Sequence, residues 1–77
     1  MGPAAVVDEG QAARISQLVH DIAITLGQRD GHNHYGAVYD KLYRAFDVTS
    51  YKNIPRARYD EAIRWLEARW AEVKEQA

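Results

Sequence analysis

The chain has 77 residues, a net formal charge of −1 and no cysteine. This length allows one small domain with a modest core, and the absence of thiols excludes disulfide bonds and cysteine-ligated metals as sources of stability. The hydrophobic fraction of 47% is typical of a globular chain, and the near-neutral charge argues against a strongly basic nucleic-acid-binding protein.

The sequence shows neither the pattern of a membrane-spanning segment nor that of a signal peptide. No apolar run approaches the roughly 18 residues of a transmembrane helix, and the opening residues MGPAAVV lack the basic start and long apolar core of a signal peptide. We therefore expect a cytoplasmic protein with no membrane-spanning segment. Residues 1–7 show no periodicity, so we expect a disordered segment over 1–7 and a single helical domain over 8–77.

The first predicted helix begins near Asp8. Asp8 and Gln11 have the spacing of a capping box, in which each side chain accepts a hydrogen bond from the other residue's amide. The next apolar residues recur at helical spacing and predict one buried stripe; they are Ile15, Leu18, Val19, Ile22 and Leu26. Gly27 is predicted to end the helix, because glycine readily adopts the left-handed conformation found at helix ends.

The second predicted helix runs from about residue 33 to residue 46. Asn33 is a favourable N-cap residue, because its side chain can accept a hydrogen bond from a free amide of the first turn. One face of this helix is apolar; it consists of Tyr35, Val38, Tyr39, Leu42 and Phe46, with Tyr43 beside them.

The third predicted helix runs from about residue 55 to residue 76. Pro55 suits the first helical position, where its missing amide hydrogen would have no partner. Asp60 and Glu61 follow near the positive end of the helix dipole. The apolar stripe is the longest in the chain and comprises Tyr59, Ala62, Ile63, Leu66, Trp70 and Val73.

Three amphipathic helices with short connections predict an all-α fold, a small three-helix bundle with an ordered turn between helices 2 and 3. The turn, DVTSYKNI, contains three apolar anchors, Val48, Tyr51 and Ile54. Ser50 is placed to cap a single short turn of helix within it.

Two apolar residues lie outside the predicted stripes. Ile24 lies about half a turn from the apolar face of the first helix, and Trp65 lies about 100° from the centre of the third helix's stripe, beside Arg58 and Arg69. In one interpretation, Trp65 seals the edge of the core while Arg69 stacks on its ring. In the other, Trp65 and Arg69 belong to an interface, where these two residue types often dominate the binding energy.

Candidate chemistry is sparse. His32 and His34, with Asp30 and His20, invite a metal-binding interpretation, but they lie in or beside a glycine-bounded loop without the three or four rigidly placed ligands of a zinc site. We therefore predict no metal site.

No catalytic arrangement stands out either. Ser16 and His20 are four residues apart but lack a third, orienting group, and Asp60 and Glu61 diverge around the helix because they are successive. No glycine-rich phosphate loop is present. We expect no enzyme activity, no cofactor and no small-molecule substrate.

The positive charge concentrates in the middle of the chain. Residues 31–59 carry a net formal charge of +3, and the segments on either side carry −2 each. Four basic residues of this segment are candidates for contacts to nucleic acid; they are Arg44, Lys52, Arg56 and Arg58.

A helix-turn-helix interpretation meets two objections. The motif joins its helices by three or four residues, and the connection here is about twice as long. Asp60 and Glu61 also follow Arg56 and Arg58 directly, and their carboxylates would repel phosphate.

The segment VYDKLYRAFDVTSYKNIPRARYDEAIRWLEARW resembles the C-terminal domain of prophage antirepressor-type regulatory proteins. The resemblance covers about residues 33–73, and SYKNIP at residues 50–55 is its most specific part. Proteins of this kind often have glycine where this chain has Asp47, and the domain usually follows an N-terminal DNA-binding or regulatory domain. The resemblance implies phage-related regulation without catalysis.

Two functional hypotheses follow. In the first, the domain is a non-catalytic phage-related regulatory module that self-associates or docks to a repressor or replication partner, through an interface that includes Trp65, Arg69 and Ile24. In the alternative, it is an accessory DNA-binding domain in phage transcription regulation that uses the four basic residues of the middle segment.

Overall fold

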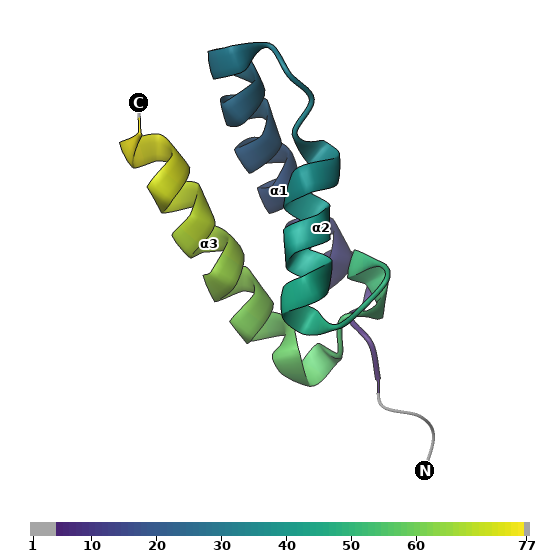
Figure 1. Ribbon diagram of the computed structural model, residues 1–77. Coiled ribbons are helices and arrows are strands. Elements are labelled where there is room, and N and C mark those ends of the chain that lie inside the picture. Colours follow the sequence, from purple (N-terminus) through teal and green to yellow (C-terminus); the bar gives the residue numbers. More distant parts are fainter. Residues whose placement is uncertain (1–4, 77) are drawn as a thin grey trace.

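The computed structural model describes residues 5–76, which form three α-helices and two short 3₁₀ turns (Figure 1). In chain order these are α1 (Glu9–Asp30), α2 (Tyr35–Phe46), η1 (Tyr51–Asn53), η2 (Arg56–Arg58) and α3 (Tyr59–Glu75). The predicted small all-α three-helix bundle is confirmed. Within residues 5–76, no helix is both long and apolar enough to cross a lipid bilayer.

The N-terminus of α1 has the predicted capping box. The Asp8 carboxylate accepts a hydrogen bond from the Gln11 amide at 2.8 Å, and the Gln11 side-chain oxygen accepts one from the Asp8 amide at 3.0 Å. Two amides that the helix itself leaves free are thereby satisfied.

The predicted end of α1 at Gly27 is wrong, because the helix continues to Asp30. Gly31 provides the left-handed residue, with φ of 75°, and its amide donates to the Gly27 carbonyl at 2.8 Å. Gly27 instead lies close to the returning chain: a Cβ atom there would lie 3.0 Å from the carbonyl oxygen of His32, a tighter contact than most Cβ atoms make. The chain that returns from α1 passes that close to the helix.

Helix α2 begins two residues later than predicted, at Tyr35. The Asn33 side chain still serves this end, since its oxygen accepts a hydrogen bond from the Tyr35 amide at 3.0 Å. At the other end Asp47 adopts the left-handed conformation, with φ of 53°, and its amide donates to the Tyr43 carbonyl. Asp47 therefore holds the helix-ending position that favours glycine.

The turn between α2 and α3 is ordered, as predicted. Ser50 caps η1 by accepting a hydrogen bond from the Lys52 amide at 3.3 Å, and Ile54 is fully buried. Pro55 does not start α3 as predicted, because the chain first makes the 3₁₀ turn η2 and α3 begins at Tyr59.

The N-terminal segment pairs with this turn. Val6 and Pro55 form an antiparallel bridge, the Val7 amide donates to the Ile54 carbonyl at 3.0 Å, and the Arg56 amide donates to the Ala5 carbonyl at 2.9 Å. The expected disorder over residues 1–7 does not hold for residues 5–7, while residues 1–4 lie outside the described part of the chain.

One core joins the three α-helices with Val7 of the N-terminal segment and Ile54 of the turn. Its buried members include Val7, Ile15, Leu18, Val19, Ile22, Val38, Leu42, Phe46, Ile54, Leu66 and Val73. Each such side chain contributes about 1.5–3 kcal/mol on burial. Both α2 and α3 pack mainly against α1, and in Figure 1 they diverge from each other with distance from η2.

Candidate functional site

The divergence of α2 and α3 leaves a groove between them. It encloses a cavity of about 220 Å³. Its floor is apolar and is formed by Ile22 and Leu26 of α1 with Val38 and Val73 of the two walls. The α2 side adds Ala37 and Lys41 with His34, which precedes the helix, and the α3 side adds Trp65, Arg69, Glu72 and Gln76.

The sequence produces this groove in two ways. Helix α2 has 12 residues and α3 has 17, so α3 extends along α1 where α2 has no counterpart. Ala37 also faces the space with only a methyl group, whereas the other α2 residues in the lining, Val38 and Lys41, carry larger side chains. The apolar floor is reached from the groove mainly at the partly buried Leu26 and Trp65, because Ile22, Val38 and Val73 are largely buried.

Trp65 lies at the edge of the core and also lines the groove. Its ring meets Phe46 edge-on, with centroids 6.4 Å apart and an interplanar angle of 85°. The guanidinium carbon of Arg69 lies 4.9 Å from the Trp65 ring centroid. Both predicted features, the sealing of the core and the stacking by Arg69, are present, and they occur at the groove.

Ile24, the third residue predicted for a partner interface, is not in this groove. It is 41% exposed on α1 and lines a separate hollow beside the loop that connects α1 to α2. The structure therefore brings together Trp65 and Arg69 but leaves Ile24 apart from them.

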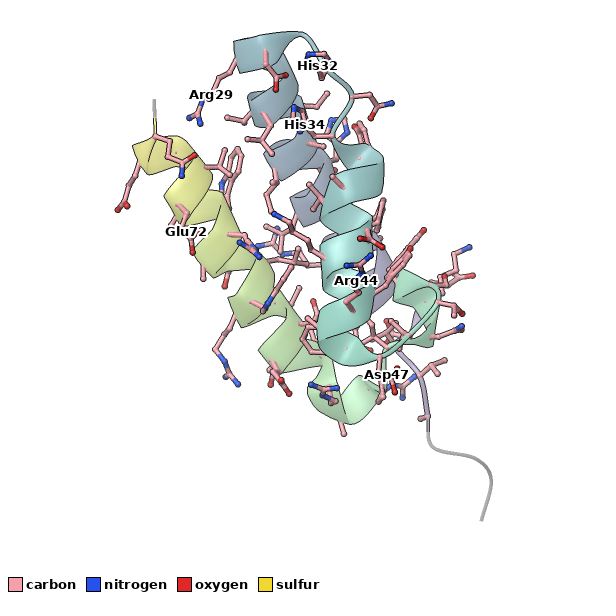
Figure 2. The ribbon with its side chains drawn as sticks, in the orientation of Figure 1. Arg29, His32, His34, Arg44, Asp47 and Glu72 are labelled. Carbon is pink, nitrogen blue, oxygen red and sulfur yellow. The ribbon has the colours of Figure 1, made fainter. Side chains whose placement is uncertain are left out.

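The walls of the groove carry charges of both signs. Lys41 takes part in no ion pair among residues 5–76, and Arg69 reaches Glu72 only at 3.9 Å. At one end Arg29 extends from α1 and donates a hydrogen bond to the Val73 carbonyl of α3 (Figure 2).

His34 is held by a carboxylate. Its Nε2 lies 2.8 Å from Asp30. The pKa of the Asp30 carboxyl is lowered from its ordinary value, first by the hydrogen bond from the His32 amide and then by the one from the His34 side chain. Asp30 therefore stays ionised, and its charge is directed at the histidines of the loop.

Two of the four residues predicted to bind nucleic acid are already paired. Arg44 contacts Asp40 at 3.2 Å. Arg58 donates two hydrogen bonds to Glu61, at 3.1 and 2.8 Å, and lies over the Phe46 ring at 4.4 Å. The hydrogen bond from Arg58 lowers the pKa of Glu61.

The other two predicted residues are free of such pairs within the described part of the chain. Lys52 on η1 and Arg56 on η2 are exposed and belong to no ion pair there. The Lys52 ammonium lies 6.0 Å from the Tyr51 ring centroid.

Ser16 and His20 do not form a nucleophile–base pair. Ser16 accepts a hydrogen bond from the Tyr39 hydroxyl at 3.4 Å, and His20 bonds to the Tyr35 hydroxyl. Over residues 5–76, no group of three or more His, Asp or Glu side chains is placed to hold a metal ion.

Sequence reasoning missed Ala37 and Lys41. These two residues are one helical turn apart, and both lie beside the buried Val38. A small residue and a lysine therefore border the apolar stripe of α2. The sequence contains this pattern, but the pattern indicates a groove only if the facing helix lies at a distance from α2. The periodicity of one helix gives no information on its distance from another helix.

The fold and the groove define a small helical domain that presents an apolar floor between two diverging helices. A family model, the ORF6C domain, matches residues 4–76. The chain therefore belongs to the ORF6C domain family, a domain found in phage-related proteins. Searches of curated proteins and of solved structures gave no match. The resemblance to phage proteins is confirmed at this level, and its antirepressor-type detail stays a prediction.

Proposed function

We propose that this ORF6C domain is a non-catalytic regulatory module of phage-related proteins that acts in the cytoplasm through protein–protein association. It would self-associate or dock to a repressor or replication partner. The observation that carries the proposal is the groove between α2 and α3, in which Trp65 and Arg69 border an apolar floor. Interfaces gain most of their affinity from such aromatic and arginine residues beside apolar pockets.

The size of the cavity favours a protein partner over a small molecule. Pockets for drug-sized ligands usually measure about 300–1,000 Å³. The cavity here is smaller, at about 220 Å³, and opens along two helices. Side chains from a partner would fill it.

A second candidate, an accessory DNA-binding domain in phage transcription regulation, is favoured by the two exposed cations Lys52 and Arg56 on adjacent turns. The pairing of Arg44 with Asp40 and of Arg58 with Glu61 weakens it. Each phosphate contact requires a cation to replace a counterion, and a cation held by a carboxylate of its own chain contributes less.

Light scattering separates these candidates. The mass of the chain is measured over a concentration series, alone and with duplex DNA, at about 50 and about 200 mM salt. A concentration-dependent oligomer that ignores DNA supports association. A monomer whose affinity for DNA collapses at the higher salt supports the second candidate and contradicts the first.

A monomer that ignores DNA calls for a cross-linking experiment in host cells that carry the related phage genes. A photoreactive side chain replaces Ala37 in the groove or, as the control, Ala68, an exposed alanine of α3 outside the groove lining. One defined protein adduct at position 37 and none at position 68 supports docking. Equal labelling at both positions contradicts a specific site.

A further inference from the structure

We propose that the groove between α2 and α3 takes one amphipathic helix from a different protein, with its apolar side chains on the groove floor and its carboxylates facing Lys41 and Arg69. This inference rests on the proposed function, because it names the occupant of the same site. It selects docking to another protein over self-association.

The shape of the groove matches a short helix. Its lining runs from His34 to Lys41 along α2 and from Trp65 to Gln76 along the α3 side. At a rise of 1.5 Å per residue, these walls are about 10 and about 16 Å long. A helix of about two to three turns spans this length, and its apolar residues at i, i+4 and i+7 would face the floor.

The charges on the walls favour an acidic occupant. Lys41 on α2 belongs to no ion pair within residues 5–76, and the 3.9 Å separation between Arg69 and Glu72 is at the limit of an ion pair. His34 is already engaged by Asp30. Two cations are thus available on opposite walls against one carboxylate, and complementary charge sets which partners associate and how fast.

A second copy of this chain does not offer the required helix. A docking helix needs two or three large apolar side chains on one exposed face. Within residues 5–76, the exposed large apolar residues are Val6, which precedes α1, and Ile24, which stands alone on α1. The apolar stripes of all three helices are instead turned into the core.

A peptide library tests this inference directly. Helical 15-residue peptides with randomised surface positions are selected for binding to the whole chain and, in parallel, to the Lys41→Glu variant. Lys52→Glu is the matched control, because Lys52 is also an exposed lysine but lies on η1, outside the groove. Circular dichroism and thermal unfolding establish that each variant is folded.

We expect the peptides selected by the unchanged chain to carry two or three Leu, Ile, Phe or Met residues at helical spacing and to be acidic. They should bind Lys41→Glu at least about tenfold more weakly and Lys52→Glu within about twofold of the unchanged chain. In a Trp70→Phe background Trp65 is the one tryptophan, so its fluorescence should change on binding.

Filling the groove gives a second, charge-independent readout. Ala37→Trp places a large ring in the groove and should abolish peptide binding, while Ala68→Trp on the outer face of α3 should leave it unchanged.

The outcomes separate this inference from the proposed function. Selected peptides that lack an acidic bias, or that tolerate Lys41→Glu and Ala37→Trp, would overturn the inference and leave protein association through another surface standing. The absence of any selected peptide also overturns it. If the same chain then binds DNA as a salt-sensitive monomer, the proposed function fails as well.

Discussion

Arg69 lies over Trp65, with its guanidinium carbon 4.9 Å from the centre of the ring. The ring is therefore covered by Arg69 on one side and meets Phe46 at its edge. Trp65 lies outside the apolar stripe of α3, yet it packs against the core at Phe46. It also lines the groove between α2 and α3. Stability and partner binding can be separated by changing the two residues one at a time.

We expect Trp65→Ala to lower the free energy of unfolding by about 2 kcal/mol, since a half-buried aromatic ring is lost from the core edge. Arg69→Ala should cost about 0.5–1 kcal/mol, which is the range of an exposed cation–π contact. Chemical denaturation followed by circular dichroism measures both. The control is Arg64→Ala, an exposed arginine on the same helix, and it should change stability by less than about 0.5 kcal/mol. A cost for Arg69→Ala equal to that of Trp65→Ala would contradict this division of roles.

Asp47 supports a second prediction, because its φ of 53° is a conformation that side-chain-bearing residues rarely adopt. Asp47→Gly should raise the free energy of unfolding by about 0.5–1 kcal/mol, since the relief of strain exceeds the greater chain entropy of glycine in the unfolded state. The control is Ala45→Gly, at an exposed position within α2, which should destabilise the chain by about 1 kcal/mol. A loss of stability on Asp47→Gly would show that the aspartate side chain itself stabilises this end of α2.

Two helical glycines differ in the space around them. A Cβ atom at Gly36 would have no neighbour within 4 Å, whereas one at Gly27 would lie 3.0 Å from the His32 carbonyl oxygen. Gly36→Ala should therefore stabilise the chain by about 0.5–1 kcal/mol through helix propensity. Gly27→Ala has the same propensity gain but pushes the loop away, so it should give no net stabilisation. Thermal unfolding of the two variants side by side provides the measurement, and equal gains would contradict the close approach.

The loss of folding stability at acid pH should depend on Asp30. Its folded pKa lies below the ordinary value of 3.8 because the His32 amide and the His34 side chain hydrogen-bond to the carboxylate. A group with a lowered folded pKa contributes stability above its unfolded pKa and loses it as the pH falls through the folded value. The melting temperature of the unchanged chain should therefore fall more steeply below about pH 4 than that of Asp30→Asn. Parallel curves for the two proteins from about pH 7 to about pH 2 would contradict this prediction.

The helices could be predicted from the sequence because each carries its own signals. Apolar spacing located the buried faces of all three, and the Asp8–Gln11 capping box and the Ser50 cap of η1 were found from residue types alone. These features depend on residues within a few positions of one another. The end of α1 was predicted wrongly because two glycines compete for the cap, and only the path of the returning chain shows that Gly27 packs closely against it.

The site was less predictable because it depends on how helices stand relative to one another. Trp65 and Arg69 were identified from residue type and position, but Ala37 and Lys41 acquire meaning only when α3 lies opposite α2. The sequence also predicted Arg44 and Arg58 as contacts to nucleic acid, but the structure shows both in ion pairs with carboxylates of the same chain. Both pairs are local, with Asp40 and Glu61 four and three residues away. A charge count over a segment does not show such pairing.

No sequence pattern predicts that residues 5–7 pair with the turn at residues 54–56. Val7 is 6% exposed and its amide donates to the Ile54 carbonyl, whereas its neighbour Val6 is 46% exposed. Val7→Ala should lower the free energy of unfolding by about 1–2 kcal/mol, because buried methyl groups leave a small cavity. Val6→Ala removes the same atoms from the surface and should cost less than about 0.5 kcal/mol. Hydrogen exchange should also quicken at the amides of residues 7 and 56 in Val7→Ala. If the two alanine variants are equally stable and these amides exchange as in the unchanged chain, the segment does not hold the turn in solution.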